Sequence, residues 1–74
     1  MKKLTIIVPV YFNEKSLEPL FQEIQTVEKE LLKKEVSLEL IFVNDGSKDN
    51  SLNELLKIRK ARPETIVINL TRNF

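Results

Sequence analysis

The sequence contains no cysteine and no histidine among its 74 residues. Their absence excludes disulfide bonds, metal sites built on thiolate or imidazole ligands, cysteine nucleophiles and Ser-His-Asp triads. Any chemistry performed by this chain must therefore come from carboxylates, amides, hydroxyls, lysine and arginine.

Glycine is nearly absent as well, since Gly46 is the only one. Neither the G-x-G-x-x-G turn nor the Walker A loop can be present, so a glycine-rich phosphate cradle is excluded. A phosphoacceptor receiver domain is disfavoured, because it would need an acidic pair where Pro9, Val10 and Tyr11 stand.

Neither sign of charge dominates, because 12 basic and 11 acidic residues leave a formal charge of +1. Basic residues are interspersed with glutamates, so we expect no nucleic-acid partner. No apolar run approaches the roughly 18 residues of a membrane span. The short apolar run after Lys3 is broken by Pro9, with no cleavage site of a signal peptide. We therefore expect a cytoplasmic chain.

Three short apolar segments rich in β-branched residues predict strands over residues 4–8, 38–43 and 65–70. Only Glu39 interrupts the middle segment, which favours a strand covered on both faces. Pro9 lacks a backbone donor, so we expect it to end the pairing of the first strand.

Apolar residues at spacings of three and four predict a helix over residues 16–34. Asn13 or Ser16 could cap this helix, and Pro19 is expected in its first turn, where no N–H partner is lost. The stripe predicted to be buried consists of Leu17, Leu20, Phe21, Ile24, Val27 and Leu31.

A second helix is predicted to begin with a capping box formed by Ser51 and Glu54 and to end before Pro63. Its apolar stripe begins with Leu52, Leu55 and Leu56.

This alternation predicts an α/β fold, a three-layer α/β/α arrangement with a parallel β-α-β-α-β sheet and right-handed crossovers. With the strands in chain order, the outer edge of the first strand has no partner within the chain. An open apolar edge invites pairing with another strand. We therefore interpret residues 1–74 as one incomplete domain, the first part of something longer.

The polar residues Asn44, Asp45, Gly46 and Ser47 follow the central apolar run. Ligands of open parallel sheets bind beyond the carboxyl ends of the strands, so Asp45 is the leading candidate for a binding residue. A plainer alternative stays open, namely a strand-to-helix turn in which Asp45 accepts from backbone donors and Gly46 supplies a positive φ.

Two other interpretations of this cluster are disfavoured. A two-residue hairpin through Asp45 and Gly46 needs a strand next, and a helical pattern follows instead. A calcium loop starting at Asp45 fails, because Asn50 stands where glycine is needed and Leu56 where glutamate is needed.

Residues 6–14, 41–52 and 69–74 together resemble the opening of a family 2 inverting glycosyltransferase of the GT-A fold. The similarity is to the polyprenyl-phosphate sugar synthases, the dolichyl-phosphate mannose synthase and bactoprenol glucosyltransferase group. It covers essentially the whole chain. The resemblance implies the N-terminal half of a Rossmann-like GT-A domain that binds a UDP- or GDP-sugar. The full-length relative would transfer the sugar to a polyprenyl phosphate, in association with the cytoplasmic face of a membrane.

Carried over by position, the resemblance places Pro9, Tyr11 and Glu14 beside the nucleotide base and ribose. It makes Asp45 the acceptor of a hydrogen bond from a ring N–H of uracil or guanine. A carboxylate accepts such a bond more strongly than a neutral side chain does. Arg72 would help to position the next loop or the donor phosphates. Plainer roles stay open: Tyr11 as a partly buried aromatic, Glu14 as an acid favouring the helix dipole, and Arg72 as a solvated residue.

Two departures from the family pattern stand out. Asn44 replaces the first aspartate of the commoner Asp-Asp-Gly-Ser, which affects only secondary interactions. The Asp-x-Asp motif that binds Mg²⁺ or Mn²⁺ in the family is missing, since the only aspartates are Asp45 and Asp49.

The family's catalytic base and acceptor site also lie in its later half, so we assign no catalytic residue to this chain. We expect the chain alone to be inactive in sugar transfer. The alternative is a non-catalytic βαβ module that self-associates through its open strand edge.

Overall fold

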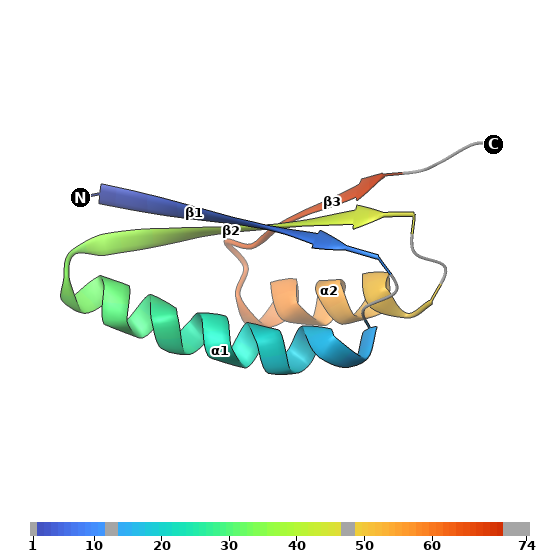
Figure 1. The fold of residues 1–74 in the computed structure, drawn as a ribbon, viewed down its shortest axis with the longest axis horizontal. Coiled ribbons are helices and arrows are strands. Elements are labelled where there is room, and N and C mark those ends of the chain that lie inside the picture. Colours follow the sequence, from blue (N-terminus) through green and yellow to red (C-terminus); the bar gives the residue numbers. More distant parts are fainter. Residues whose placement is uncertain (1, 12–13, 47–48, 71–74) are drawn as a thin grey trace.

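The computed structural model describes residues 2–11, 14–46 and 49–70. Strands and helices alternate along the whole chain (Figure 1). In chain order they are β1 (Lys2–Val10), α1 (Glu14–Lys33), β2 (Val36–Asp45), α2 (Ser51–Ala61) and β3 (Ile66–Leu70). The predicted β-α-β-α-β order is confirmed.

The three strands form one parallel sheet in the order β1-β2-β3. Val10 is in register with Asn44, and Asn44 with Asn69, so the carboxyl ends of all three strands meet at one edge. Asn44 and Asp45, the last two residues of β2, lie at this edge.

Both helices lie on the same face of the sheet (Figure 1). The strand order proceeds in one direction, and right-handed crossovers then place every helix on the same side. The described part of the chain therefore has one helical layer, and the second helical layer of the predicted α/β/α arrangement does not occur within it. Of the two described helices, neither is both long and apolar enough to cross a bilayer.

The core lies between the helices and the sheet face that they cover. Every second residue of β2 from Leu38 to Asn44 is buried there. The apolar residues of the core are Val10, Leu17, Phe21, Ile24, Leu38, Leu40, Phe42, Leu55 and Ile58. The alternate residues of β2 are half-buried, and on β1 the side chain of Ile7 is 63% exposed. The prediction that the central strand is covered on both faces is therefore wrong for the described chain.

β1 is longer than predicted, because pairing continues through Pro9 to Val10. The expectation that Pro9 ends the ladder is wrong. Proline is tolerated here because β1 is an edge strand of the described sheet, where its residues have a strand neighbour on one side only.

Helix α1 begins at Glu14, two residues earlier than predicted. Ser16 consequently lies inside the helix and is not its cap, while Asn13 lies outside the described residues. Pro19 also lies inside the helix, not in its first turn as predicted. Along the predicted stripe, Val27 is the exception to burial, with 45% of its surface exposed.

Helix α2 ends at Ala61, before Pro63 as predicted, but its start differs from the prediction. The N-cap is Asn50, which makes no side-chain capping bond, and Ser51 is the first helical residue. The predicted capping box is therefore wrong. The carboxylate of Asp49 takes over the capping role, accepting a hydrogen bond from the Ser51 backbone N–H at 3.0 Å.

Candidate functional site

The candidate site is the edge of the sheet where the strands end. Asp45 is the last residue of β2 and is half-buried. Gly46 follows with a φ of 71°, a left-handed conformation that any residue with a Cβ atom adopts at a cost. The predicted strand-to-helix turn at Gly46 is thus confirmed, and it releases the chain from the sheet directly after Asp45.

Alternation along the strands determines which predicted residues share a face. Pro9 is in register with Val43, and Asp45 lies two residues beyond Val43, so Pro9 and Asp45 belong to the same face. This is the face away from the helices, where Leu70 is the register partner of Asp45. The structure therefore brings these two predicted residues to one face at one end of the sheet.

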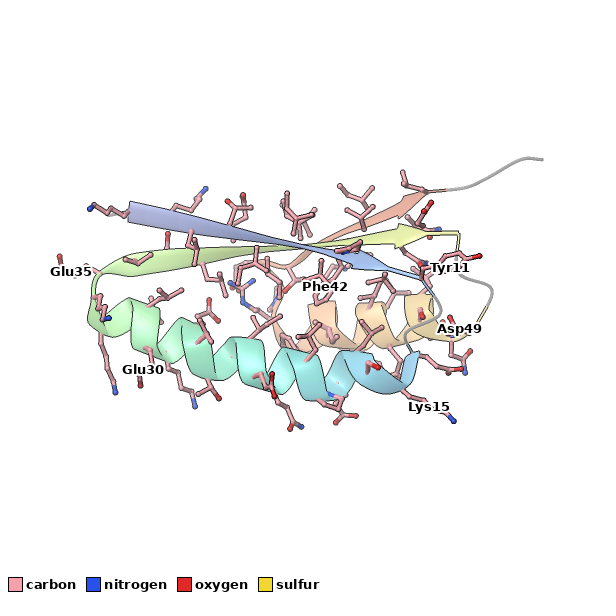
Figure 2. The ribbon with its side chains drawn as sticks, in the orientation of Figure 1. Tyr11, Lys15, Glu30, Glu35, Phe42 and Asp49 are labelled. Carbon is pink, nitrogen blue, oxygen red and sulfur yellow. The ribbon has the colours of Figure 1, made fainter. Side chains whose placement is uncertain are left out.

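Tyr11 directly follows β1 and is 60% exposed. Figure 2 shows it at the same end of the molecule as Asp49 and opposite Glu35. This exposure weakens, but does not exclude, the plainer interpretation of Tyr11 as a partly buried aromatic. An exposed aromatic ring at the strand ends offers a flat apolar surface and a hydroxyl to a ligand.

Glu14 is the first residue of α1 and is half-buried. A carboxylate in the first turn of a helix is stabilised by the helix dipole, so this plainer role of Glu14 is met by its position. Arg72, the remaining predicted site residue, lies outside the described residues.

Asp49 joins the starts of the two helices. One carboxylate oxygen, Oδ1, accepts from the Ser51 N–H, and the other, Oδ2, accepts from the Glu14 N–H at 3.5 Å. Hydrogen bonding from the Ser51 hydroxyl is the main cause that lowers the pKa of Asp49. The sequence pattern did not predict this link, although an aspartate two residues before the first helical residue is a signal of local capping.

Asn44 and Asn69 form a second link that the sequence pattern did not predict. The Nδ2 atom of Asn44 donates to Oδ1 of Asn69 at 3.0 Å. Asn44 lies on the helix-covered face and is only 2% exposed. This bond connects the carboxyl ends of β2 and β3 next to Asp45.

Two grooves lined by described residues run between the helices, and no strand residue lines either of them. One, of about 360 Å³, is lined by residues of α1 and α2 that include Phe21 and Ile58. The other, of about 430 Å³, includes Glu14 and Glu54 but not Asp45 or Tyr11.

The described residues do not fit a divalent metal site. Across residues 2–11, 14–46 and 49–70, no group of three or more acidic side chains could hold a metal ion. The arrangement at the strand ends suits a different chemistry. A carboxylate, an exposed aromatic ring and a proline at one end can bind a planar ring that carries an N–H donor.

Comparison with known proteins gives a consistent family. Residues 5–74 match the profile of glycosyl transferase family 2. An uncharacterized glycosyltransferase of Synechocystis is 38% identical over 72 residues, which are 97% of this chain and 22% of that protein. The prophage bactoprenol glucosyl transferase homolog of Escherichia coli K12 is 36% identical, with 97% of this chain and 22% of that protein covered.

An uncharacterized glycosyltransferase of Bacillus subtilis is 39% identical over 70 residues, covering 95% of this chain and 21% of that protein. The chain thus spans about a fifth of the length of these relatives.

Proposed function

Because the chain belongs to glycosyltransferase family 2, we propose that residues 1–74 are the donor-nucleotide half of a GT-A domain that is incomplete in this chain. Its ligand is the nucleotide of a UDP- or GDP-sugar. The observation that carries this proposal is the position of Asp45, at the carboxyl end of the central strand of a parallel sheet.

In this proposal each predicted residue has a separate task. Asp45 accepts a hydrogen bond from the ring N–H of uracil or guanine, and Pro9 and Tyr11 border the base and ribose. Glu14, at the start of α1, borders the base and ribose as well. Arg72 follows β3 and assists with the next loop or the donor phosphates. The shared face of Pro9 and Asp45 and the exposure of Tyr11 support this division.

The complete protein would transfer the sugar to a polyprenyl phosphate at the cytoplasmic face of a membrane. The name of the E. coli relative, a bactoprenol glucosyl transferase homolog, supports this acceptor class. A divalent ion, Mg²⁺ or Mn²⁺, would neutralise the leaving diphosphate in such an enzyme. The sequence has no Asp-x-Asp motif, so we propose that this chain alone binds nucleotide without transferring sugar.

The test is a two-dimensional amide NMR titration of the 74-residue chain with UDP and with GDP. We expect shifts at Tyr11, at Asp45 and at the residues next to Pro9. We also expect a loss of affinity of about tenfold or more in Asp45→Ala, because a hydrogen bond to a charged group is removed. Glu39→Gln is the matched control, since Glu39 lies on the same face of β2, six residues earlier.

A well-dispersed spectrum that neither nucleotide changes would contradict the proposal for this chain, as would equal losses in the Asp45 and Glu39 variants. An undispersed spectrum would show that further strands are needed for folding, and the titration would then be repeated on the longer protein.

A second candidate function is a non-catalytic module that self-associates. It is favoured by the outer edge of β1, which pairs with no strand of the described chain, and by the 63% exposure of Ile7 beside that edge. Analytical ultracentrifugation separates the two candidates. A monomer that binds nucleotide supports the donor half, whereas a defined dimer that ignores both nucleotides supports the module.

A further inference from the structure

The side chain of Asn44 is placed differently from that of Asp45, its neighbour in the sequence. Asn44 points to the helix-covered face, where it is 2% exposed, while Asp45 belongs to the opposite face. Asn69 is the register partner of Asn44 on β3, and its Oδ1 atom accepts a hydrogen bond from Nδ2 of Asn44 at 3.0 Å. The end of β2, directly before Asp45, is therefore joined to β3 by a side-chain hydrogen bond.

The other half of the Asn44 amide is not satisfied by the fold. Its Oδ1 atom is buried and has no hydrogen-bond partner among the described residues. A buried acceptor without a partner costs folding free energy, whereas an apolar side chain of similar size would not. Stability alone therefore does not account for asparagine at this position.

We propose that Asn44 is a positioning residue that acts through Asn69 to hold Asp45 in the orientation that binds the nucleotide. This inference rests on the proposed function of Asp45. Residues 44 and 45 share one peptide unit and point to opposite faces, so a rotation that swings Asp45 would also pull Asn44 away from Asn69. The bond between the two amides resists that rotation.

The same bond links Asp45 to the end of β3. Asn69 immediately precedes Leu70, which is the register partner of Asp45. Holding Asn69 therefore also sets the position from which the chain leaves the sheet after β3. Asn44 itself is too deeply buried to contact a ligand, so its effect on binding is indirect.

The experiment compares Asn44→Leu with the wild-type chain in three measurements: unfolding in urea, affinity for UDP and GDP, and amide hydrogen exchange without nucleotide. We expect Asn44→Leu to be as stable as wild type or more stable, because the unsatisfied oxygen is gone. We expect its dissociation constant for nucleotide to rise about tenfold and the amides of Asp45 and Leu70 to exchange about tenfold faster.

Asn44→Asp is the rescue variant, because a rotated Asn69 amide can donate to the new carboxylate. Its affinity should stay close to that of wild type. Thr5→Val is the matched control, since it removes another bond between strands, Thr5 Oγ1 to Glu39 Oε1 at 3.0 Å, away from the strand ends. Should Asn44→Leu fail to fold, Asn69→Ala removes the same bond from the exposed partner.

Unchanged affinity in Asn44→Leu would overturn the positioning role, and so would an equal loss in Thr5→Val. If the wild-type chain binds neither nucleotide, the proposed function is wrong for this chain. The exchange measurement then still tests whether the bond between Asn44 and Asn69 holds the ends of β2 and β3. Unchanged exchange at Asp45 and Leu70 would then overturn the link itself.

Discussion

Arg62 and Glu28 form a two-pronged ion pair on the helical side of the sheet. Nε of Arg62 donates to Oε1 of Glu28 at 3.1 Å, and Nη2 donates to Oε2 at 2.7 Å. Arg62 is 7% exposed and also donates to the Leu38 carbonyl at 2.7 Å and to the Thr65 hydroxyl at 3.3 Å. One side chain thus connects the end of α2 with α1, β2 and the residue before β3.

Removal of Glu28 should destabilise the chain strongly. Glu28→Ala leaves the buried guanidinium without its counter-ion, and such a break costs about 3 kcal/mol or more of the free energy of unfolding. Glu30→Ala is the control, because Glu30 pairs with Lys33 at 3.3 Å on the surface, where a pair contributes less than about 0.5 kcal/mol. Urea unfolding measures both, and equal losses would contradict the buried role.

The Glu28 pair should also make stability depend on acidity. Hydrogen bonding from Arg62 lowers the pKa of Glu28 below its ordinary value of 4.5. The unfolded chain therefore binds a proton at Glu28 more readily than the folded chain does. The contribution of the pair to the free energy of unfolding is present above pH 4.5 and is lost as the pH falls through the lowered pKa. Acid titration of the circular dichroism signal should show a shallower loss in Glu28→Gln than in wild type. Parallel curves would refute this assignment.

Asp49 should hold the first turns of both helices. Asp49→Ala removes the acceptor of the Glu14 and Ser51 amides, and we expect both amides to exchange faster with solvent. Asn53→Ala is the control, since it removes a bond from α2 to the side chain of its N-cap residue, Asn50, and leaves Asp49 in place. The prediction fails if the Glu14 amide is as protected in Asp49→Ala as in wild type.

Glu35 should be a site where glycine stabilises the chain. Its φ of 60° lies in the left-handed region, which costs a residue with a Cβ atom about 1 kcal/mol. Glu35→Gly should therefore raise the free energy of unfolding by up to about 1 kcal/mol. Lys34, at the preceding position, has no positive φ, so Lys34→Gly should lower the free energy of unfolding. Thermal unfolding compares the two, and a loss in both variants would exclude strain at Glu35.

Truncation of apolar side chains should distinguish the two faces of the sheet. Leu40 is fully buried under the helices, so Leu40→Ala should cost about 2 to 5 kcal/mol. Ile7 is 63% exposed on the other face, so Ile7→Ala should change stability by less than about 0.5 kcal/mol in the monomer. A large loss in Ile7→Ala that grows with protein concentration would instead show that this face is covered in an oligomer.

Much of the fold was predictable from local patterns. The nearly unbroken apolar run of residues 38–43 predicted β2, and the three- and four-residue spacing from Leu17 to Leu31 predicted α1. Both patterns depend only on neighbours in the chain. The glycine turn after Asp45 was predictable for the same reason. The end of β1 was not, because tolerance of Pro9 depends on β1 being an edge strand.

The sequence by itself determined the order of elements, the parallel sheet and the polar residues at its edge, because periodicity and turn chemistry are properties of short segments. Only the tertiary structure decided the partners of the polar side chains. Arg62 and Glu28 are 34 residues apart, Asn44 and Asn69 are 25, and Glu14 and Asp49 are 35. Such pairs leave no periodic signal in the sequence, because they form only after packing brings the strand and helix ends together.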